Sequence, residues 1–481
     1  FTERIKGGLE TRIVKIVSNN FVNDKRLIYW QHSVGDTVPI GAGLIILINS
    51  SLVSVNNQQV ESILVAYCAN ISIQNNEIFN GTSGIHLTYS TMSFLSENTL
   101  CDHKMAGILL EYSQNNTINN NTIANNHEEG ILLSTSRDNV LTNNWVTNNS
   151  KEGIALKHSE NNKLESNFIA YNLDEGIWIW AEEMNCFGTY QCNGPSYGYN
   201  ILTCNTIIKN NGAGIIIECS GKSTLFNNTI SNNEWGIFFQ NSGNSNLTNN
   251  TINNNNETGI VLGYSQNSTV FGNTIKHNSG RGISLYFSED CRIMANTIIN
   301  SSEIGIYLYL YSSRSTITWN KVVKNKDYGI QLTYCCENST IQHNDFYRNN
   351  IKGVSQAYDD GGNNLFSYNH WNDWTYPDNN KDGITDYAYP IDGEASNSDQ
   401  FPLISPNLSP FEITNTYTGS SIPSLTTVLI TSSSSHQEST SRIKKGHRSE
   451  SISLILTSLV IIVFTIYKRR KKSILFEKSS K

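Results

Sequence analysis

A glycine followed by an apolar residue recurs through most of the 481-residue chain at intervals of 22 to 24 residues, with one interval of 38. A fixed period of this length is the signature of a solenoid, in which each repeat forms one coil. Two degenerate repeats at Gly43 and Ser62 bring the expected number of coils to about 14. The repeat glycines are Gly84, Gly107, Gly130, Gly153, Gly176, Gly214, Gly236, Gly259, Gly282, Gly305, Gly329 and Gly353.

Each repeat holds three short apolar runs, for example around Ile123, around Ile131 and Leu133, and around Leu141. Alternation over so few residues indicates strands and not helices. Three strands per repeat, without long connections, predict an all-β fold: a right-handed single-stranded parallel β-helix over residues 43–365. The side chains one and three positions after the glycine should fill the core, and those two and four positions after it should point outward.

Polar residues repeat in phase with the glycine. Equivalent positions of neighbouring coils should stack about 4.8 Å apart, so that amide side chains can hydrogen-bond along the stack. Serine lies six residues after the glycine in most repeats, and asparagine lies nine before it: Asn98, Asn121, Asn144, Asn167, Asn205, Asn250, Asn273, Asn296, Asn320 and Asn344, with Asn228 at eight.

The segments outside the repeats differ in composition. The chain has a formal net charge of −7. Its end from Arg442 onward carries eleven Lys and Arg against two Glu, a net charge of +9, so the remainder carries −16. This acidic remainder argues against a nucleic-acid partner. The expected division is an N-terminal cap over 1–42, an insertion in the β-helix at 181–199, a C-terminal cap over 366–410, a Ser/Thr-rich stalk over 411–450, a transmembrane helix over 451–467 and a basic cytoplasmic tail over 468–481.

Residues 451–467 are largely apolar and contain no charge. At a rise of about 1.5 Å per residue, such a helix is just long enough to cross a thin bilayer. The basic cluster 468–472 follows directly and favours a cytoplasmic C-terminus. We therefore expect a single-pass cell-membrane protein with an extracellular β-helix, which Asn-x-Ser/Thr sequons such as Asn80 and Asn115 would allow to be glycosylated.

The expected C-terminal cap contains a calcium-like loop. Its glycine, Gly383, stands at the sixth position, where a calcium loop turns sharply. The bidentate glutamate expected at the twelfth position is replaced by Tyr389, so a structural calcium site and a plain Asx-rich turn are both open. The oxygen-bearing side chains stand at positions 1, 3, 5 and 9: Asp378, Asn380, Asp382 and Asp386.

Glu129, Glu152 and Glu175 each precede a repeat glycine, so they should stack on three consecutive coils. Such a column needs a cation, a lysine or raised pKa values. Carboxylates on adjacent coils would stand near the ~5 Å separation of retaining glycosidases, and those on alternate coils near the ~9 Å of inverting ones. These glutamates are therefore candidate catalytic residues, with ordinary solvated surface charge as the alternative.

Other candidate ligand-binding residues fall on the same and following coils. They are Lys157, His158, Trp178, Trp180 and Glu218. Carboxylates beside exposed tryptophans are typical of sugar-binding sites. The outward positions two after the glycine are apolar over seven coils, which is more than a soluble surface normally exposes. We expect the insertion to fold back over this strip, burying Trp178 and leaving Trp180 partly exposed; a second subunit covering the strip is the alternative.

The repeat, as in NNTIANNHEEGILLSTSRDNVLTNN, resembles that of NosD-type proteins, within the wider pectin-lyase-like group of carbohydrate-binding and sugar-hydrolysing β-helices. The segment NHWNDWTYPDNNKDGITDYAYPI is similar to the terminal cap of many NosD-like proteins. The resemblance covers about residues 30–405 and implies the fold more specifically than the function.

Four functions follow from these patterns as alternatives. The first is a membrane-anchored β-helix that binds glycans or other surface polymers. The others are a polysaccharide hydrolase or lyase, a structural or adhesive surface-coat protein, and a NosD-like metal-accessory protein. NosD proteins assist copper delivery, but only 4 Met and scattered His give a soft metal little to bind here. No cofactor besides calcium is expected.

Overall fold

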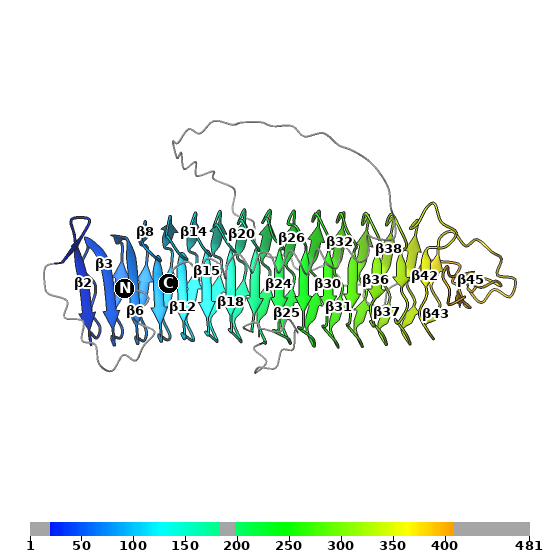
Figure 1. The fold of residues 1–481 in the computed structure, drawn as a ribbon, viewed down its shortest axis with the longest axis horizontal. Helices are drawn as coiled ribbons and strands as arrows, with labels where there is room; N and C mark the ends of the chain where they lie inside the picture. The colour runs from blue at the N-terminus through cyan, green and yellow to red at the C-terminus, as the bar shows by residue number, and fades with distance from the viewer. Residues whose placement is uncertain (1–19, 182–197, 408–481) are drawn as a thin grey trace, which may run out of the picture. The chain divides into compact units, whose positions relative to one another are not determined.

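The computed structural model describes residues 20–181 and 198–407. Within these ranges the regular structure consists of β-strands, which stack along one axis as a parallel β-solenoid (Figure 1). The stack has about 13 coils, one fewer than expected. The difference arises because the 14 stacked strands in each of two sheets are separated by 13 intervals.

Sheet A holds 16 strands, of which the first two form an antiparallel pair and the rest run parallel. Its strands, in spatial order, are β1 (Phe21–Val22), β2 (Lys25–Gln31), β3 (Ala42–Ile48), β6 (Ser62–Ala66), β9 (Ile85–Thr88), β12 (Ile108–Glu111), β15 (Ile131–Ser134), β18 (Ile154–Lys157), β21 (Ile177–Trp180), β24 (Ile215–Glu218), β27 (Ile237–Gln240), β30 (Ile260–Gly263), β33 (Ile283–Tyr286), β36 (Ile306–Tyr309), β39 (Ile330–Leu332) and β42 (Ala357–Asp359).

Sheet B follows sheet A in each coil and holds 14 parallel strands. They are β4 (Ser54–Asn56), β7 (Ser72–Gln74), β10 (Phe94–Ser96), β13 (Thr117–Asn119), β16 (Val140–Thr142), β19 (Lys163–Glu165), β22 (Ile201–Thr203), β25 (Thr224–Phe226), β28 (Asn246–Thr248), β31 (Thr269–Phe271), β34 (Arg292–Met294), β37 (Thr316–Thr318), β40 (Thr340–Gln342) and β43 (Leu365–Ser367).

Sheet C completes each coil, again with 14 parallel strands, and a small antiparallel sheet D pairs β45 (Tyr389–Pro390) with β46 (Ser398–Asp399). The strands of sheet C are β5 (Gln59–Val60), β8 (Glu77–Phe79), β11 (Thr99–Cys101), β14 (Thr122–Ala124), β17 (Trp145–Thr147), β20 (Phe168–Ala170), β23 (Thr206–Ile208), β26 (Thr229–Ser231), β29 (Thr251–Asn253), β32 (Thr274–Lys276), β35 (Thr297–Ile299), β38 (Lys321–Val323), β41 (Asp345–Tyr347) and β44 (His370–Trp371).

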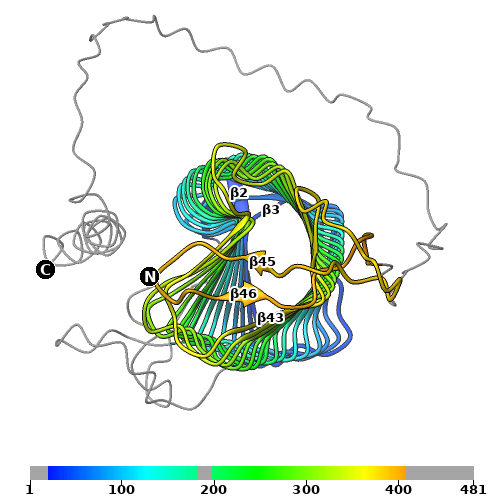
Figure 2. The same cartoon turned by 90° about the vertical axis from the view of Figure 1, so that its right-hand side faces the viewer.

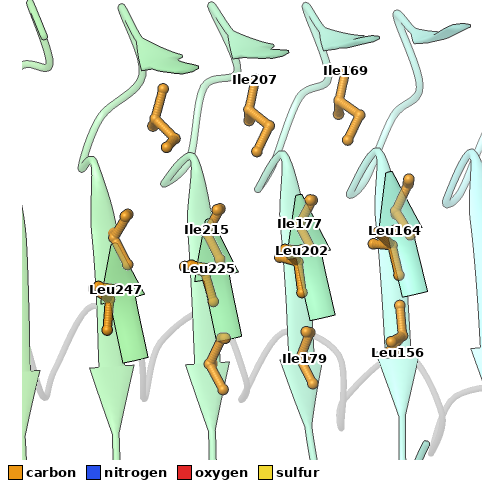
Figure 3. Close-up of a cluster of buried hydrophobic side chains, with 14 of the residues drawn as sticks. Leu156, Leu164, Ile169, Ile177, Ile179, Leu202, Ile207, Ile215, Leu225 and Leu247 are labelled. Carbon is orange, nitrogen blue, oxygen red and sulfur yellow. The ribbon is translucent and has the colours of Figure 1, made fainter. Parts of the chain in front are cut away.

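The core is built from the positions that the repeat assigned to it. Ile131 and Leu133, one and three positions after Gly130, are fully buried. Each stacks on the equivalent side chain of the next coil, since Ile131 pairs with Ile154 and Leu133 with Leu156. Figure 3 shows these aliphatic rows running from coil to coil inside the solenoid. No single coil could bury such a row alone, so the coils stabilise one another.

The repeat glycine is required by close packing. A Cβ atom at Gly153 would lie 2.4 Å from Cγ2 of Ile169 and 2.8 Å from the carbonyl oxygen of Gly176. Both contacts are far shorter than carbon atoms tolerate, and one of them is to backbone that cannot move freely. The glycine therefore stands just before each strand of sheet A, at a point where the backbone packs closely against a side chain of sheet C.

Asparagine has two separate uses in each turn. Asn144 is buried, donates from Nδ2 to Oδ1 of Asn167 at 3.0 Å, and accepts from Nδ2 of Asn121 at the same distance. The preceding Asn143 is exposed and has φ 53°, a left-handed conformation that asparagine tolerates better than most residues. The Asn-Asn pairs of the repeat are thus one turn residue followed by one ladder residue.

The structure contains more ladders than the sequence predicted. The asparagine and serine ladders expected at nine before and six after the glycine are present, as the bond from the Ser113 N–H to Oγ of Ser136 shows. A second asparagine ladder runs four positions before the glycine, through Asn126 and Asn149. A third links Asn116 to Asn139. Three turns per coil therefore carry buried amide ladders, because each bend leaves backbone groups that no strand can satisfy.

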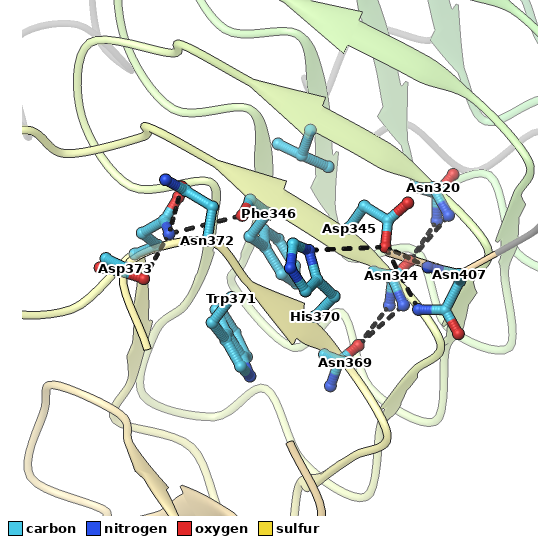
Figure 4. A network of polar contacts seen from close by, with 12 residues as sticks. Asn320, Asn344, Asp345, Phe346, Asn369, His370, Trp371, Asn372, Asp373 and Asn407 are labelled. Carbon is cyan, nitrogen blue, oxygen red and sulfur yellow. Dashed lines mark hydrogen bonds and ion pairs between the residues drawn. The ribbon is translucent and has the colours of Figure 1, made fainter. Parts of the chain in front are cut away.

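The last coil is closed by aromatic and acidic side chains. Trp371 stacks on Phe346 with ring centroids 4.4 Å apart and on Tyr389 at 4.1 Å. The ladder that passes through Asn344 and Asn369 in Figure 4 ends on a carboxylate. There Oδ2 of Asp399 accepts the backbone N–H and the Nδ2 of Asn369, both at 3.0 Å.

The predicted stalk, transmembrane helix and basic tail, and most of the insertion, lie outside the described residues. Within residues 20–181 and 198–407, no helix is long and apolar enough to cross a membrane. The insertion does not disturb the register of the stack, since β19 and β22 pair Lys163 with Ile201 across it. Cys219 is disulfide-bonded, whereas Cys204 is a free thiol.

Candidate functional site

The outward side of sheet A, formed by the side chains two and four positions after each repeat glycine, is called here the sheet-A face. We expected the insertion, or a second subunit, to cover its apolar strip. Most of the insertion lies outside the described residues, so this cover remains a prediction. Several members of the strip are buried, with exposed fractions of 6% for Leu109, 0% for Ala155 and 3% for Val261. The backbone cross-section of the coils is indented on the side of sheet A (Figure 2).

A stacked tryptophan pair lies in the middle of this face. Trp178 and Trp180 project from β21 to the same side, with ring centroids 4.0 Å apart and planes 21° from parallel. Nε1 of Trp178 donates to Oε2 of Glu218 on the next coil at 3.0 Å. Both rings are half-buried. Trp180 is therefore partly exposed, as expected, whereas Trp178 is less buried than expected.

Two further candidate residues come from the preceding coil. Nζ of Lys157, at the end of β18, lies 5.9 Å from the centroid of the Trp180 ring. This is within the range of a cation–π contact. His158 bonds through Nδ1 to the carbonyl oxygen of Ala181 at 2.7 Å. Lys157 therefore belongs to the tryptophan cluster, while His158 is engaged with the backbone of the next coil.

The three glutamates form a column at the other edge of sheet A, where each strand begins. Glu129, Glu152 and Glu175 are buried, with exposed fractions of 7%, 3% and 8%. Burial, reinforced by the charges of Glu129 and Asp174, raises the pKa of Glu152 to about 8. Burial also raises the pKa of Glu129, against the opposing effect of Lys151, and that of Glu175, together with Asp174 and Glu152. The alternative of solvated surface charge is therefore wrong for this column.

Two neighbours of the column were not singled out by sequence. Lys151 lies 3.4 Å from Oε1 of Glu128 and 3.5 Å from Oε1 of Glu129. Asp174 joins Glu152 and Glu175 in a group whose ligand atoms all lie within 4.8 Å of one another. The charged residue just before each column glutamate, in Glu-Glu, Lys-Glu and Asp-Glu, was the signal that could have identified them.

The structure separates the two parts of the predicted site. The glutamates precede the strands of sheet A, and Lys157 and Trp180 end them, five residues further along. At about 3.3 Å per strand residue the two groups stand roughly 16 Å apart. They are thus opposite edges of one face. The catalytic roles of Glu129, Glu152 and Glu175 remain predictions.

The calcium-like loop in the C-terminal cap is held by hydrogen bonds from backbone N–H groups to Asp side chains. Oδ2 of Asp378 accepts the N–H of Gly383 at 3.0 Å, and Oδ1 of Asp382 accepts the N–H of Ile384 at 2.9 Å. Asn379 bonds Asp386 through both its backbone N–H and its side chain, and Asn380 donates to Asp382. These bonds explain the loop conformation with or without an ion, so calcium at this position remains a prediction.

The strand stacking defines a parallel β-helix protein. The family model described as "Periplasmic copper-binding protein (NosD)" matches residues 17–187, and that described as "Right handed beta helix region" matches residues 185–310 and 236–371. The chain is a NosD-like parallel β-helix protein.

Several solved structures are similar to the chain at low identity. The mannuronan C-5 epimerase AlgE6 A-module of Azotobacter vinelandii is 14% identical, with a TM-score of 0.45, over 68% of this chain and 91% of that one. A GH87 alpha-1,3-glucanase catalytic unit from Streptomyces thermodiastaticus is 13% identical, with a TM-score of 0.32, over 70% and 60%. No curated protein sequence matches the chain significantly.

The group of converging ligand atoms among the described residues does not fit the copper of the family description. Copper(I) favours thiolate and thioether ligands. Among residues 20–181 and 198–407, Glu152, Asp174 and Glu175 are the one group of three acidic, His or Cys side chains whose ligand atoms converge, and all its donors are oxygen. That donor set suits a hard cation.

Proposed function

We propose that this protein binds a carbohydrate polymer along the sheet-A face. The observation that carries the proposal is the stacked pair of Trp178 and Trp180, half-buried beside Lys157 and Glu218. Aromatic rings flanked by polar groups bind sugars by packing against their apolar C–H faces while the polar groups bind hydroxyls. A face that continues over many coils suits an extended chain better than a small ligand.

Replacing Trp180 by alanine tests this proposal. The full chain, purified in detergent, is screened on a glycan array and its affinity for the best-bound polymer is measured by calorimetry. We expect Trp180→Ala to weaken binding about tenfold, because loss of an aromatic contact costs on the order of 1.4 kcal/mol.

Trp145 offers a matched control. It lies on sheet C, is 47% exposed, and stacks on Phe168 with centroids 4.0 Å apart. Trp145→Ala should leave binding unchanged. Equal losses in both variants, or none in either, would show that the sheet-A face is not the binding surface, and a protein that binds no glycan at all would favour the structural or adhesive alternative.

The same samples distinguish binding from catalysis. Release of reducing ends, or of unsaturated uronates, from a bound polymer would show the hydrolase or lyase alternative. We expect neither product to exceed its level in a boiled sample. The reason is that, among the described residues, the glutamates of the acidic column lie away from the tryptophan pair that we propose binds the sugar.

We further propose that residues 451–467 anchor the protein in the membrane with the β-helix outside the cell. This rests on the uncharged apolar run and the basic cluster behind it. Cysteine introduced beside the cluster 468–472 should react with thiol reagents only after the membrane is permeabilised. Labelling of this cysteine from outside intact cells would show the opposite orientation, with the C-terminus outside the cell.

A further inference from the structure

Glu152 is a carboxyl group with no counter-charge bonded to it. Its side chain is 3% exposed, and its Oε2 has no hydrogen-bond partner. Oε2 of Glu129, on the preceding coil, is also buried and also has no hydrogen-bond partner. Among the described residues Glu152 has no ion pair. An unsatisfied buried carboxylate is strongly destabilising, so positive charge has to reach it from a proton or a cation.

The acids around Glu152 outnumber the bases. Glu128, Glu129, Asp174 and Glu175 lie on the same three coils, and Lys151 is the basic side chain among them. The ammonium group of Lys151 is engaged by Glu128 and Glu129. Its single charge cannot balance four acids and Glu152 as well. The excess is concentrated toward Asp174 and Glu175.

The ligand atoms of three of these acids lie close enough together to hold one cation. One atom each from Glu152, Asp174 and Glu175 lies within 4.8 Å of the others. An ion bound at 2.3–2.6 Å, as calcium is, holds ligand oxygens up to about 5 Å apart. Magnesium, at about 2.0–2.1 Å, requires a tighter set. We propose that Glu152, Asp174 and Glu175 bind one calcium ion between two adjacent coils.

The fold explains why such a site stands here. Glu152 and Glu175 occupy the same position of consecutive coils, and Asp174 is the residue before Glu175. Asp174 is less buried than Glu152, so it offers a partly solvated edge from which an ion and its remaining water ligands enter. The site is independent of the proposed sugar binding, which concerns the opposite edge of sheet A.

Calcium titration of the full chain tests the site. The parent is Asp382→Ala, which removes the cap loop as a competing candidate. After removal of cations with EDTA, we expect calorimetry near neutral pH to detect one calcium ion per chain and calcium to raise the melting temperature. Glu152→Gln and Asp174→Asn should each weaken binding at least about tenfold, since each removes a charged ligand. Magnesium should bind at least about tenfold more weakly than calcium.

A crossing of melting temperatures provides the second readout. In EDTA, Glu152→Gln should melt above the parent, because it removes a buried carboxyl group that has to take up a proton when the chain folds without the ion. In calcium the parent should melt higher. Glu128→Gln, outside the ligand group, should bind calcium like the parent. Calcium binding unchanged in Glu152→Gln, no binding by the parent, or tighter binding of magnesium would overturn the proposal. The calcium test is separate from the sugar-binding test, so the result obtained with Trp180→Ala does not change how calcium binding is interpreted.

Discussion

Replacing Asn250 by alanine should lower the free energy of unfolding by about 4 kcal/mol. Asn250 is fully buried. Its Nδ2 donates to the carbonyl oxygen of Leu225 and to Oδ1 of Asn273, both at 2.9 Å, and its Oδ1 accepts the N–H and Nδ2 of Asn228. Alanine removes all four bonds. It leaves the Leu225 carbonyl and the Asn228 N–H buried without these partners, each at a cost of about 1–3 kcal/mol.

Asn246 serves as the control because it lies in the same coil but is exposed. Asn246→Ala should change the unfolding free energy by less than about 0.5 kcal/mol. Chemical denaturation of both variants provides the measurement. Hydrogen exchange should also be faster at the backbone N–H of Asn228 in the ladder variant, because this N–H loses its acceptor. A ladder variant as stable as the control would mean that the amide ladders contribute little to stability.

His103 should make the protein sensitive to acid. It is fully buried in the ladder four positions before the glycine, where its neighbours have asparagine. Its Nδ1 accepts the N–H of Gly81 at 3.2 Å, and Nε2 lies 3.2 Å from the carbonyl oxygen of Ile78, so the neutral ring is satisfied. Burial lowers the pKa of His103 to about 4, despite the opposing effect of these bonds and of Asp102.

The sign of the effect follows from that pKa. The folded protein holds the proton less tightly than the unfolded chain, whose histidine has a pKa near 6.5. The stabilising contribution is therefore complete above about pH 6.5 and is lost as the pH falls toward about 4. The total loss attributable to His103 should be about 3 kcal/mol, measured as the unfolding free energy against pH.

His103→Asn should remove this acid sensitivity, because asparagine continues the ladder without a titrating group. The exposed His127 lies one coil further on, and His127→Asn should leave the pH dependence unchanged. Since other buried acids titrate equally in all three proteins, the difference between the curves isolates His103. Parallel curves for the wild type and His103→Asn would contradict the assignment.

Much of the fold could be read from local pattern. Ile131 and Leu133 are core residues because a strand alternates its faces, and Asn144 is a ladder residue because its position repeats in every coil. The ladder through Asn126 was not predicted, although asparagine recurs four positions before the glycine. Other asparagines lie next to this position, so its regular spacing is hard to recognise in the sequence. The coil count was one too high because the 14 stacked strands of a sheet are separated by only 13 intervals.

The candidate site was predictable only in part. The stacking of Glu129, Glu152 and Glu175 followed from their shared phase in the repeat, as did the common origin of Trp178 and Trp180 on one strand face. Which atoms are unpartnered, and that Lys151 pairs with Glu129 while Asp174 joins Glu152 and Glu175, depend on side-chain directions at a turn. Repeat phase does not specify those directions.

The sequence by itself determined the period, the three strands per coil, the inward residues and the stacking of like side chains, because each is a property of one repeat and its nearest neighbour. Only the tertiary structure decided that Ala155 and Val261, on the outward face of sheet A, are buried, and that Glu152 is buried and has a raised pKa. Burial depends on the path of the turns that flank a residue, and that path is set by the packing of whole coils and not by the alternation within a strand.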